Sequence, residues 1–280
     1  MMVCIDENII SPRSGGANEV LLFFDGGLGI AVCGKGGSGK TALVALMIKH
    51  IIQGGHKKLL VIDADPTMNL PMVLGLKPEK TINDIREKII NEARTYNESD
   101  KENLARSLDY MLFEALMETD DFSFLIMGRP ESLGCYCPVN DILRNGIETL
   151  AEHFDTIIID GEAGVEQINR QVMRGVDIPI IVSDISSRGL QTASLIKKVI
   201  ESHNQIINFT KMGLVLNRVR GNEDQLEEYA APTGLDLFGF VPEDENITLF
   251  DMQARPLLEI PDNSPAFMAV EKILHQIDAA

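Results

Sequence analysis

The segment Gly34–Thr41, with the sequence Gly-Lys-Gly-Gly-Ser-Gly-Lys-Thr, constrains what this chain can fold into more than any other feature. It follows an apolar run typical of a buried strand and precedes a helical pattern, the context in which a phosphate-binding loop occurs. Glycines let the backbone approach an anion closely, and successive N–H groups before a helix form a nest for phosphate oxygens. In such a loop Lys40 reaches the β- and γ-phosphates, and the Thr41 hydroxyl is a ligand of Mg²⁺. The residues predicted to contact ATP or ADP here are Gly34, Lys35, Gly36, Gly37, Ser38, Gly39, Lys40, Thr41 and Ala42.

Apolar runs alternate with helical patterns along the rest of the chain, which indicates strand–helix–strand units and a parallel sheet. We therefore predict an α/β P-loop NTPase fold, a mostly parallel twisted sheet of about seven or eight strands with helices on both faces. The predicted strands are Gly29–Cys33, Lys58–Asp63, Phe124–Met127, Thr156–Asp160, Ile178–Ser183, Gly213–Asn217 and Asp236–Phe240. The predicted helices are Lys40–Gln53, Thr81–Asn91, Lys101–Met117, Val139–His153, Gly189–His203, Asp224–Ala230 and Pro265–Ile277.

The chain of 280 residues is long enough for one large domain, and no linker divides it. We predict a single ATPase domain over residues 29–280. Residues 1–28 form an extension before the phosphate loop, with a turn-like stretch followed by the apolar run Val20–Phe24. We interpret this extension as an added edge strand or hairpin, and a regulatory or partner-binding arm is the alternative.

Composition excludes several classes of function. The net charge of −17 and the pI of about 4.7 would repel a phosphate backbone, so nucleic-acid binding is disfavoured. No apolar run reaches the roughly 18 residues of a membrane span, so no stable membrane insertion is expected. The N-terminus has no basic region typical of a signal peptide, and there are only four cysteines. A cytoplasmic protein with reduced thiols is therefore predicted.

Lys35, directly after the first glycine of the loop, narrows the prediction further. The pattern Gly-Lys-Gly-Gly-x-Gly-Lys-Thr resembles the deviant Walker A motif of the MinD/ParA/nitrogenase-iron-protein ATPases. In that family the additional lysine crosses a dimer interface and contacts the partner's nucleotide. The resemblance therefore implies ATP hydrolysis, a nucleotide-dependent homodimer, and a catalytic role in trans for Lys35 beside Lys40.

Two strands that end in acidic residues fit the same family. Asp63 and Asp65 follow the apolar run Leu60–Ile62, at the position where an open α/β sheet places its chemistry. By resemblance Asp65 would orient or deprotonate the attacking water, and Asp63 would act around Mg²⁺. The segment Thr156–Gly164 resembles the Walker B and switch II element. There Asp160 would hold the Mg²⁺ shell through water, and the Gly164 amide would meet the γ-phosphate.

The predicted base site lies later in the chain. The run Leu214–Val219 resembles the family strand whose terminal asparagine, here Asn217, recognises adenine. An asparagine can both donate and accept a hydrogen bond at the adenine edge, which suits ATP over GTP. Arg218 follows it, and the segment around Pro242 resembles the loop that closes over the base.

Cys135 and Cys137 are one residue apart and can chelate one soft or borderline metal ion. Two thiolates supply only two of the four ligands that such an ion needs. A symmetric dimer in which each chain contributes both cysteines would supply all four. The spacing favours a shared Ni²⁺ or Zn²⁺ ion. An iron–sulfur cluster shared across the dimer remains an alternative, and a disulfide between them would be strained.

The Cys-x-Cys pair combined with the ATPase motifs resembles the CooC-type ATPases, which assist nickel insertion into carbon monoxide dehydrogenase. The likeness extends from about Ile30 to the end of the chain. It implies an ATP-driven metallochaperone whose client is a nickel enzyme such as carbon monoxide dehydrogenase or acetyl-CoA synthase. A reductase or iron–sulfur carrier like the nitrogenase iron protein is the first alternative. A positioning or partition ATPase without a metal role is the second.

Overall fold

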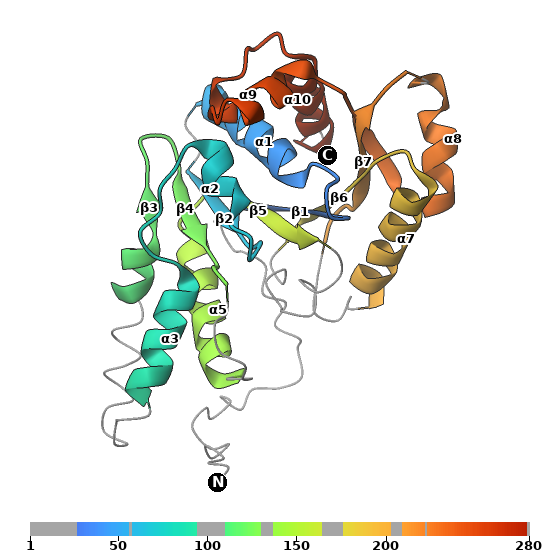
Figure 1. The fold of residues 1–280 in the computed structure, drawn as a ribbon. Coiled ribbons are helices and arrows are strands. Elements are labelled where there is room, and N and C mark those ends of the chain that lie inside the picture. The colour runs from blue at the N-terminus through green and yellow to red at the C-terminus, as the bar shows by residue number, and fades with distance from the viewer. Residues whose placement is uncertain are drawn as a thin grey trace.

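The computed structural model describes residues 27–55, 58–93, 110–129, 137–163, 176–202, 209–221 and 223–278. Within these residues one sheet of eight strands has the order β3-β4-β2-β5-β1-β6-β7-β8 (Figure 1). All neighbouring strands are parallel except β3 and β4, which are antiparallel. The predicted mostly parallel sheet is therefore confirmed. The strands are β1 Leu28–Gly34, β2 Leu59–Asp63, β3 Met117–Glu118, β4 Ser123–Ile126, β5 Thr156–Ala163, β6 Ile178–Ser183, β7 Gly213–Val219 and β8 Asp236–Pro242.

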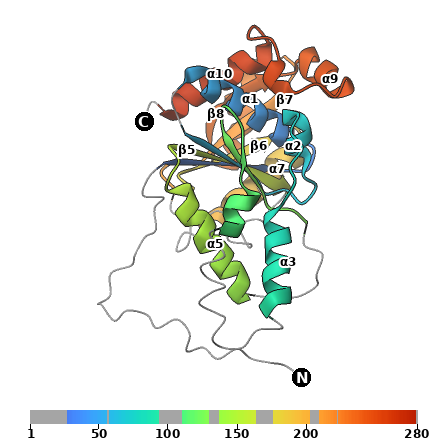
Figure 2. The same cartoon turned by 90° about the vertical axis from the view of Figure 1, so that its left-hand side faces the viewer.

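Helices cover both faces of this sheet, with α1, α9 and α10 on one side and α3 and α5 on the other (Figure 2). The helices with defined ends are α1 Lys40–Gly54, α2 Asn69–Leu74, α3 Ile82–Ala93, α5 Cys137–Ala151, α7 Ser187–Ser202, α8 Leu226–Ala230, α9 Glu245–Met252 and α10 Pro265–Asp278. Residues 110–115 are also helical. None of the helices in the described part of the chain is long and apolar enough to cross a membrane.

Two separate apolar cores follow from the alternation of side chains along each strand. On β2, Leu60 and Ile62 pack into the core that contains α3, α5 and α7, whereas Leu59 and Val61 pack into the core beneath α1 and α10. Successive side chains of a strand point to opposite faces, so a strand covered on both sides must be apolar at every position. This is why the central strands are continuous aliphatic runs in the sequence.

The predicted helix Lys101–Met117 is wrong at its end, because Met117 begins an antiparallel edge strand. Met117 lies opposite Phe124, and Glu118 lies opposite Ser123. The turn between them is closed by Thr119, whose N–H donates to the Phe122 carbonyl at 2.9 Å. The Thr119 hydroxyl donates to the same carbonyl at 2.7 Å. These hydrogen bonds of Thr119 close the turn between β3 and β4, and a threonine side chain commonly bonds the backbone in this way.

Two short helices near the nucleotide edge were not predicted. Helix α2 contains Pro71 in its first turn, where the missing N–H costs no helical hydrogen bond. Helix α9 begins after Asp244, whose side chain accepts a hydrogen bond from the Asn246 N–H at 2.9 Å. The Asp244 cap is a signal that the sequence already contained. The remaining predicted helices and strands differ from the observed ones only at their ends, as is usual for such boundaries.

Some predictions fall on residues that the structure does not describe. Residues 1–26 contain nearly all of the predicted extension, so its assignment as a strand, hairpin or arm stays a prediction. The first described strand, β1, begins one residue earlier than predicted, at Leu28.

Candidate nucleotide site

The carboxyl ends of four parallel strands form one edge of the sheet, and the predicted site residues lie there. The phosphate loop follows β1, which lies beside β5, and β5 lies beside β2. In this register Asp160 of β5 is opposite both Val32 of β1 and Asp63 of β2. Strand order thus brings the two acidic strand ends next to the loop, as an open α/β sheet requires.

The phosphate loop has no room for side chains at two of its glycines. A Cβ on Gly34 would come within 2.2 Å of the Val182 carbonyl oxygen of β6, and Gly34 has a φ of +152°. A Cβ on Gly39 would come within 2.3 Å of Asn217 Nδ2, and Gly39 has a φ of +88°. The backbone therefore runs close against β6 and β7. Glycine is needed here both for its positive φ and for this close approach.

Lys40 begins helix α1 and is buried beside the loop. It is only 6% exposed, and its Nζ donates to the Lys35 carbonyl at 3.4 Å. The same carbonyl accepts from the Ser38 N–H at 3.2 Å, which closes the turn of the loop. The ammonium group is thus held within the loop, as the motif predicts for a residue that contacts phosphates. The Lys35 side chain itself is half-buried, and its role across a dimer stays a prediction.

Asp63 and Asp160 form a buried acidic pair at this edge. Asp63 is 0% exposed and Asp160 is 1% exposed. Burial and the neighbouring charge of Asp160 raise the pKa of Asp63 to about 7. Burial also raises the pKa of Asp160 to about 7, although the Thr41 hydroxyl and the Lys40 ammonium act in the opposite direction. Two buried carboxylates beside each other are costly unless a cation or a proton neutralises them.

Several oxygens of this cluster lack good hydrogen bonds within the described part of the chain. They are Ser38 Oγ, Asp63 Oδ2 and both carboxylate oxygens of Asp160. Carboxylate and hydroxyl oxygens are the ligands that Mg²⁺ prefers, directly or through water. The orphaned oxygens beside Thr41 therefore fit the predicted magnesium ion.

Asp65 lies just beyond β2, half-buried, at the start of the turn that leads to α2. Its N–H donates to Asp63 Oδ1 at 3.0 Å. Its own Oδ1 accepts from the Thr67 N–H at 2.8 Å and from the Thr67 hydroxyl at 2.7 Å. The turn therefore fixes this carboxylate next to the acidic pair. Its predicted action on the attacking water remains a prediction.

Asn217 and Arg218, at the end of β7, contact the phosphate loop directly. The Asn217 side-chain amide donates to the Ser38 carbonyl at 2.8 Å, and Arg218 Nη1 donates to the Gly37 carbonyl at 3.3 Å. Pro242, at the end of β8, lies opposite Val219 in the sheet. Asn217 and Arg218 therefore border the loop, Pro242 lies on the next strand, and the predicted contact of these three residues with adenine stays a prediction. The bonds from β7 to the loop carbonyls were not predicted, because strand order had to be known first.

Other predicted site residues lie outside the described residues. Gly164 and Cys135 belong to undescribed segments, and Cys137 is described only as the first backbone position of α5. Their predicted roles at the γ-phosphate and at a metal ion stay predictions.

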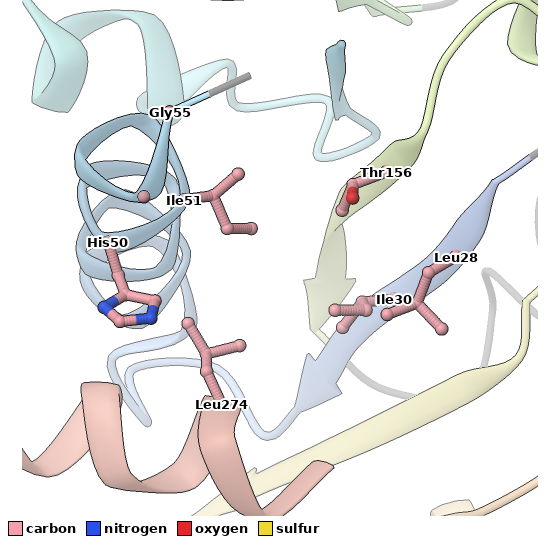
Figure 3. Close-up of a pocket in the computed structure, with 8 residues that line it drawn as sticks. Leu28, Ile30, His50, Ile51, Gly55, Thr156 and Leu274 are labelled. Atoms are coloured by element: carbon pink, nitrogen blue, oxygen red, sulfur yellow. The ribbon is translucent and has the colours of Figure 1, made fainter. Parts of the chain in front are cut away.

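Two cavities lie at the opposite edge of the sheet from the phosphate loop. One, of about 80 Å³, is lined by side chains from α1, β1, β5 and α10, including His50, Ile30 and Leu274 (Figure 3). The other, of about 500 Å³, lies near the start of β2 and β4 and is lined by Phe113, Phe122 and other residues. Both adjoin the amino ends of the parallel strands, so neither belongs to the nucleotide site.

Comparison with known proteins identifies the family. Residues 30–257 match the model of the CobQ/CobB/MinD/ParA nucleotide-binding domain, a range that includes the phosphate loop, both acidic strand ends and Asn217. The chain belongs to this family. Members of the MinD/ParA family are ATPases, and this protein is accordingly an ATPase.

The similar proteins include two sequences and a solved structure. An uncharacterized ATP-binding protein of Methanocaldococcus jannaschii is 40% identical over 253 residues, which cover 89% of this chain and 97% of that protein. The carbon monoxide dehydrogenase accessory protein CooC of Rhodospirillum rubrum is 28% identical over 255 residues, covering 85% of this chain and 90% of that protein. The septum site-determining protein MinD of Pyrococcus horikoshii, complexed with Mg-ADP, has a TM-score of 0.64 at 22% identity, covering 90% of this chain and 96% of that one.

Proposed function

We propose that this MinD/ParA-family ATPase is a metallochaperone that assists nickel insertion into carbon monoxide dehydrogenase or a related nickel enzyme such as acetyl-CoA synthase. The observation that carries the proposal is the similarity to the accessory protein CooC along nearly the whole chain. The pair Cys135 and Cys137 supports it, because two thiolates from each of two chains complete a site for one Ni²⁺ or Zn²⁺ ion. In this proposal the metal ion is the cargo.

The nucleotide half of the proposed cycle uses Mg-ATP. The orphaned oxygens of Asp63 and Asp160, with the Thr41 hydroxyl, would hold Mg²⁺, which neutralises charge on the phosphates when it is bound. Lys40 would stabilise the developing negative charge, and Asp65 would orient or deprotonate the attacking water. The Mg-ADP in the similar Pyrococcus horikoshii protein supports this assignment. Asn217, Arg218 and Pro242 would border the adenine.

Dimer formation would connect the two halves. Lys35 would contact the partner's nucleotide, so ATP binding would favour a closed dimer and bring the two Cys-x-Cys pairs together. Cys33 is not an additional ligand candidate, because burial raises the pKa of its thiol to about 12 and its Sγ donates to the Ile180 carbonyl. A thiolate is the form that binds metal, so the site depends on the partner chain.

The position of α10 favours this proposal over a membrane-bound positioning ATPase. The apolar side of α10, including Phe267, Val270 and Leu274, is buried in the core beneath α1 and β8. An interfacial membrane helix needs its apolar face to be available to lipid. The described residues of α10 use that face for folding instead.

The test is metal binding combined with sizing. We expect the wild-type protein to bind about one Ni²⁺ or Zn²⁺ per two chains and to dimerise with Mg-ATP. The double variant Cys135→Ala/Cys137→Ala should lose the metal, whereas the control Cys4→Ala should retain it. Stoichiometric metal in the double variant would overturn the proposal. A brown protein with a charge-transfer band after strictly anaerobic purification would instead support the iron–sulfur alternative.

A further inference from the structure

We propose that Asn217 is a positioning residue for the phosphate loop, which prepares the loop for a triphosphate whatever base the nucleotide carries. Arg218 is the second support of the same loop. The inference rests on contacts between the end of β7 and two consecutive carbonyl groups of the loop.

The contacts form a matched set. Arg218 Nη1 donates to the Gly37 carbonyl at 3.3 Å, and Asn217 Nδ2 donates to the next carbonyl, that of Ser38, at 2.8 Å. The Asn217 amide cannot be turned around without loss, because its Oδ1 accepts from the Arg218 N–H at 2.9 Å. One face of this buried amide therefore accepts from its own strand end, and the other donates to the loop.

The orientation of one peptide group explains why this bond affects phosphate binding. In a planar trans peptide the N–H points away from the C=O. The bond to Asn217 therefore turns the Ser38 carbonyl toward β7 and the Gly39 N–H to the opposite side. N–H groups that point to a common side form the anion nest of such loops. If this peptide flipped, a carbonyl oxygen would face the phosphates instead.

The loop sequence makes such a flip easy in the absence of a support. Gly37 and Gly39 flank Ser38 and have φ values of +76° and +88°. Glycine adopts both signs of φ at little cost, so the backbone alone does not select one orientation. Asn217 can make the selection because it is in direct contact with the loop and is attached to a rigid strand whose residues Leu214–Leu216 are fully buried.

The same side chain keeps capacity for a base. A primary amide has two N–H donors and an oxygen with two lone pairs. The bonds to Ser38 and Arg218 use one donor and one lone pair. Recognition of adenine and support of the loop are therefore compatible, and only a ligand without a base separates them.

The experiment compares Mg-ATP with Mg-tripolyphosphate by isothermal titration calorimetry. We expect Asn217→Ala to raise the dissociation constants of both ligands about tenfold, which corresponds to the loss of one hydrogen bond to a positioned group. If the affinity for ATP falls and the affinity for tripolyphosphate does not, Asn217 contacts only the base and the proposal is wrong. If neither affinity falls, the loop does not depend on Asn217, and the proposal is also wrong.

Asn83→Ala is the matched control. Asn83 and Asn217 are both buried asparagines at 7% exposure, and Asn83 lies at the start of α3 outside the phosphate loop. We expect Asn83→Ala to leave both affinities unchanged. A merely structural role of Asn217 would lower the number of binding sites per chain and leave the affinity of the folded fraction intact. If Asn217→Ala does not fold, Asn217→Ser, whose hydroxyl is too short to reach the Ser38 carbonyl, is measured against the same two outcomes.

Discussion

Aspartates lie at both edges of this parallel sheet, and the two edges treat them differently. At the amino ends of the strands, Asp177 accepts from the Gly29 N–H at 2.7 Å and Asp155 accepts from the Lys58 N–H at 2.9 Å. At the carboxyl ends, Asp63 and Asp160 are deeply buried and retain oxygens without good hydrogen bonds among the described residues. The first pair ties strand starts together. The second pair fits a cation, so the hydrogen-bond partners of an aspartate, and not its residue type, distinguish the two edges.

The cavities lead to the same distinction. The cavity in Figure 3 lies at the amino edge and is lined mainly by aliphatic side chains. The carboxyl edge instead has an exposed glycine loop that a nucleotide would cover. Neither of the two cavities described above marks the predicted nucleotide edge, which is consistent with a nest of backbone N–H groups that binds phosphate on an open surface.

The largest expected effect separates two buried lysines of the same helix. Lys40→Ala should lower kcat/KM for ATP by about 10²–10³-fold, because a preorganised cation at the phosphates is removed. The free energy of unfolding of the Lys40→Ala variant should change little. Lys49→Ala should instead lower the free energy of unfolding by about 1–3 kcal/mol, because Lys49 donates to the Ile260 carbonyl and pairs with Asp262 at 2.8 Å. Steady-state kinetics and urea unfolding of both variants measure this, and equal loss of activity in both would contradict it.

A loss of stability between pH 5 and pH 8 should come from the acidic pair Asp63 and Asp160. Burial raises the pKa values of Asp63 and Asp160 from 3.8 to about 7, so the folded protein binds more protons than the unfolded chain between these values. Their stabilising contribution is full below about pH 4 and is lost as the pH rises through 7. Without nucleotide and with a metal chelator, the free energy of unfolding should fall between pH 5 and pH 8 by about 2–3 kcal/mol for each of the two carboxyls. The variant Asp160→Asn should show a flatter profile, and identical profiles would contradict the prediction.

Two glycines that both have a positive φ should respond differently to a methyl group. Gly39 has a φ of +88° and no room for a Cβ beside Asn217, whereas Gly55, at the end of α1, has a φ of +68° and open space. Gly55 also has a ψ of 154°, a combination that is almost restricted to glycine, so Gly55→Ala should cost about 1–3 kcal/mol of stability through backbone strain alone and should leave ATP binding intact. Gly39→Ala should cost about 1–3 kcal/mol and should weaken ATP binding, because the loop must move away from β7. Thermal unfolding and ATP titration would show whether the two variants differ.

The smallest effect is expected at the amino edge. Asp155→Ala removes the acceptor for the Lys58 N–H, an exposed hydrogen bond, and should lower the free energy of unfolding by about 0.5–1.5 kcal/mol. ATP hydrolysis should stay within about twofold of the wild type, since the change lies at the other end of the strands. A large loss of activity in this variant would show that the two edges are coupled and would contradict their separate roles.

Local patterns in the sequence were enough to predict most of the framework. The aliphatic runs that became β1, β2 and β6 are apolar at nearly every position, which predicts strands covered on both faces of a parallel sheet. The glycine-lysine-threonine loop predicts its own conformation and chemistry. The helix ending at Met117 was predicted wrongly because the Thr119 turn competes with a helix in a way that hydrophobic periodicity does not reveal.

The sequence by itself determined that this chain has a phosphate loop after a buried strand and that Asp63 and Asp160 follow two further aliphatic runs. Only the tertiary structure decided which residues support that loop. Ser38 and Asn217 are 179 positions apart, and their hydrogen bond exists because β7 lies two places from β1 in the sheet. Periodicity records which residues form a strand but carries no information on the order of strands. That order comes from the packing of the whole chain, and it places Asn217 against Ser38.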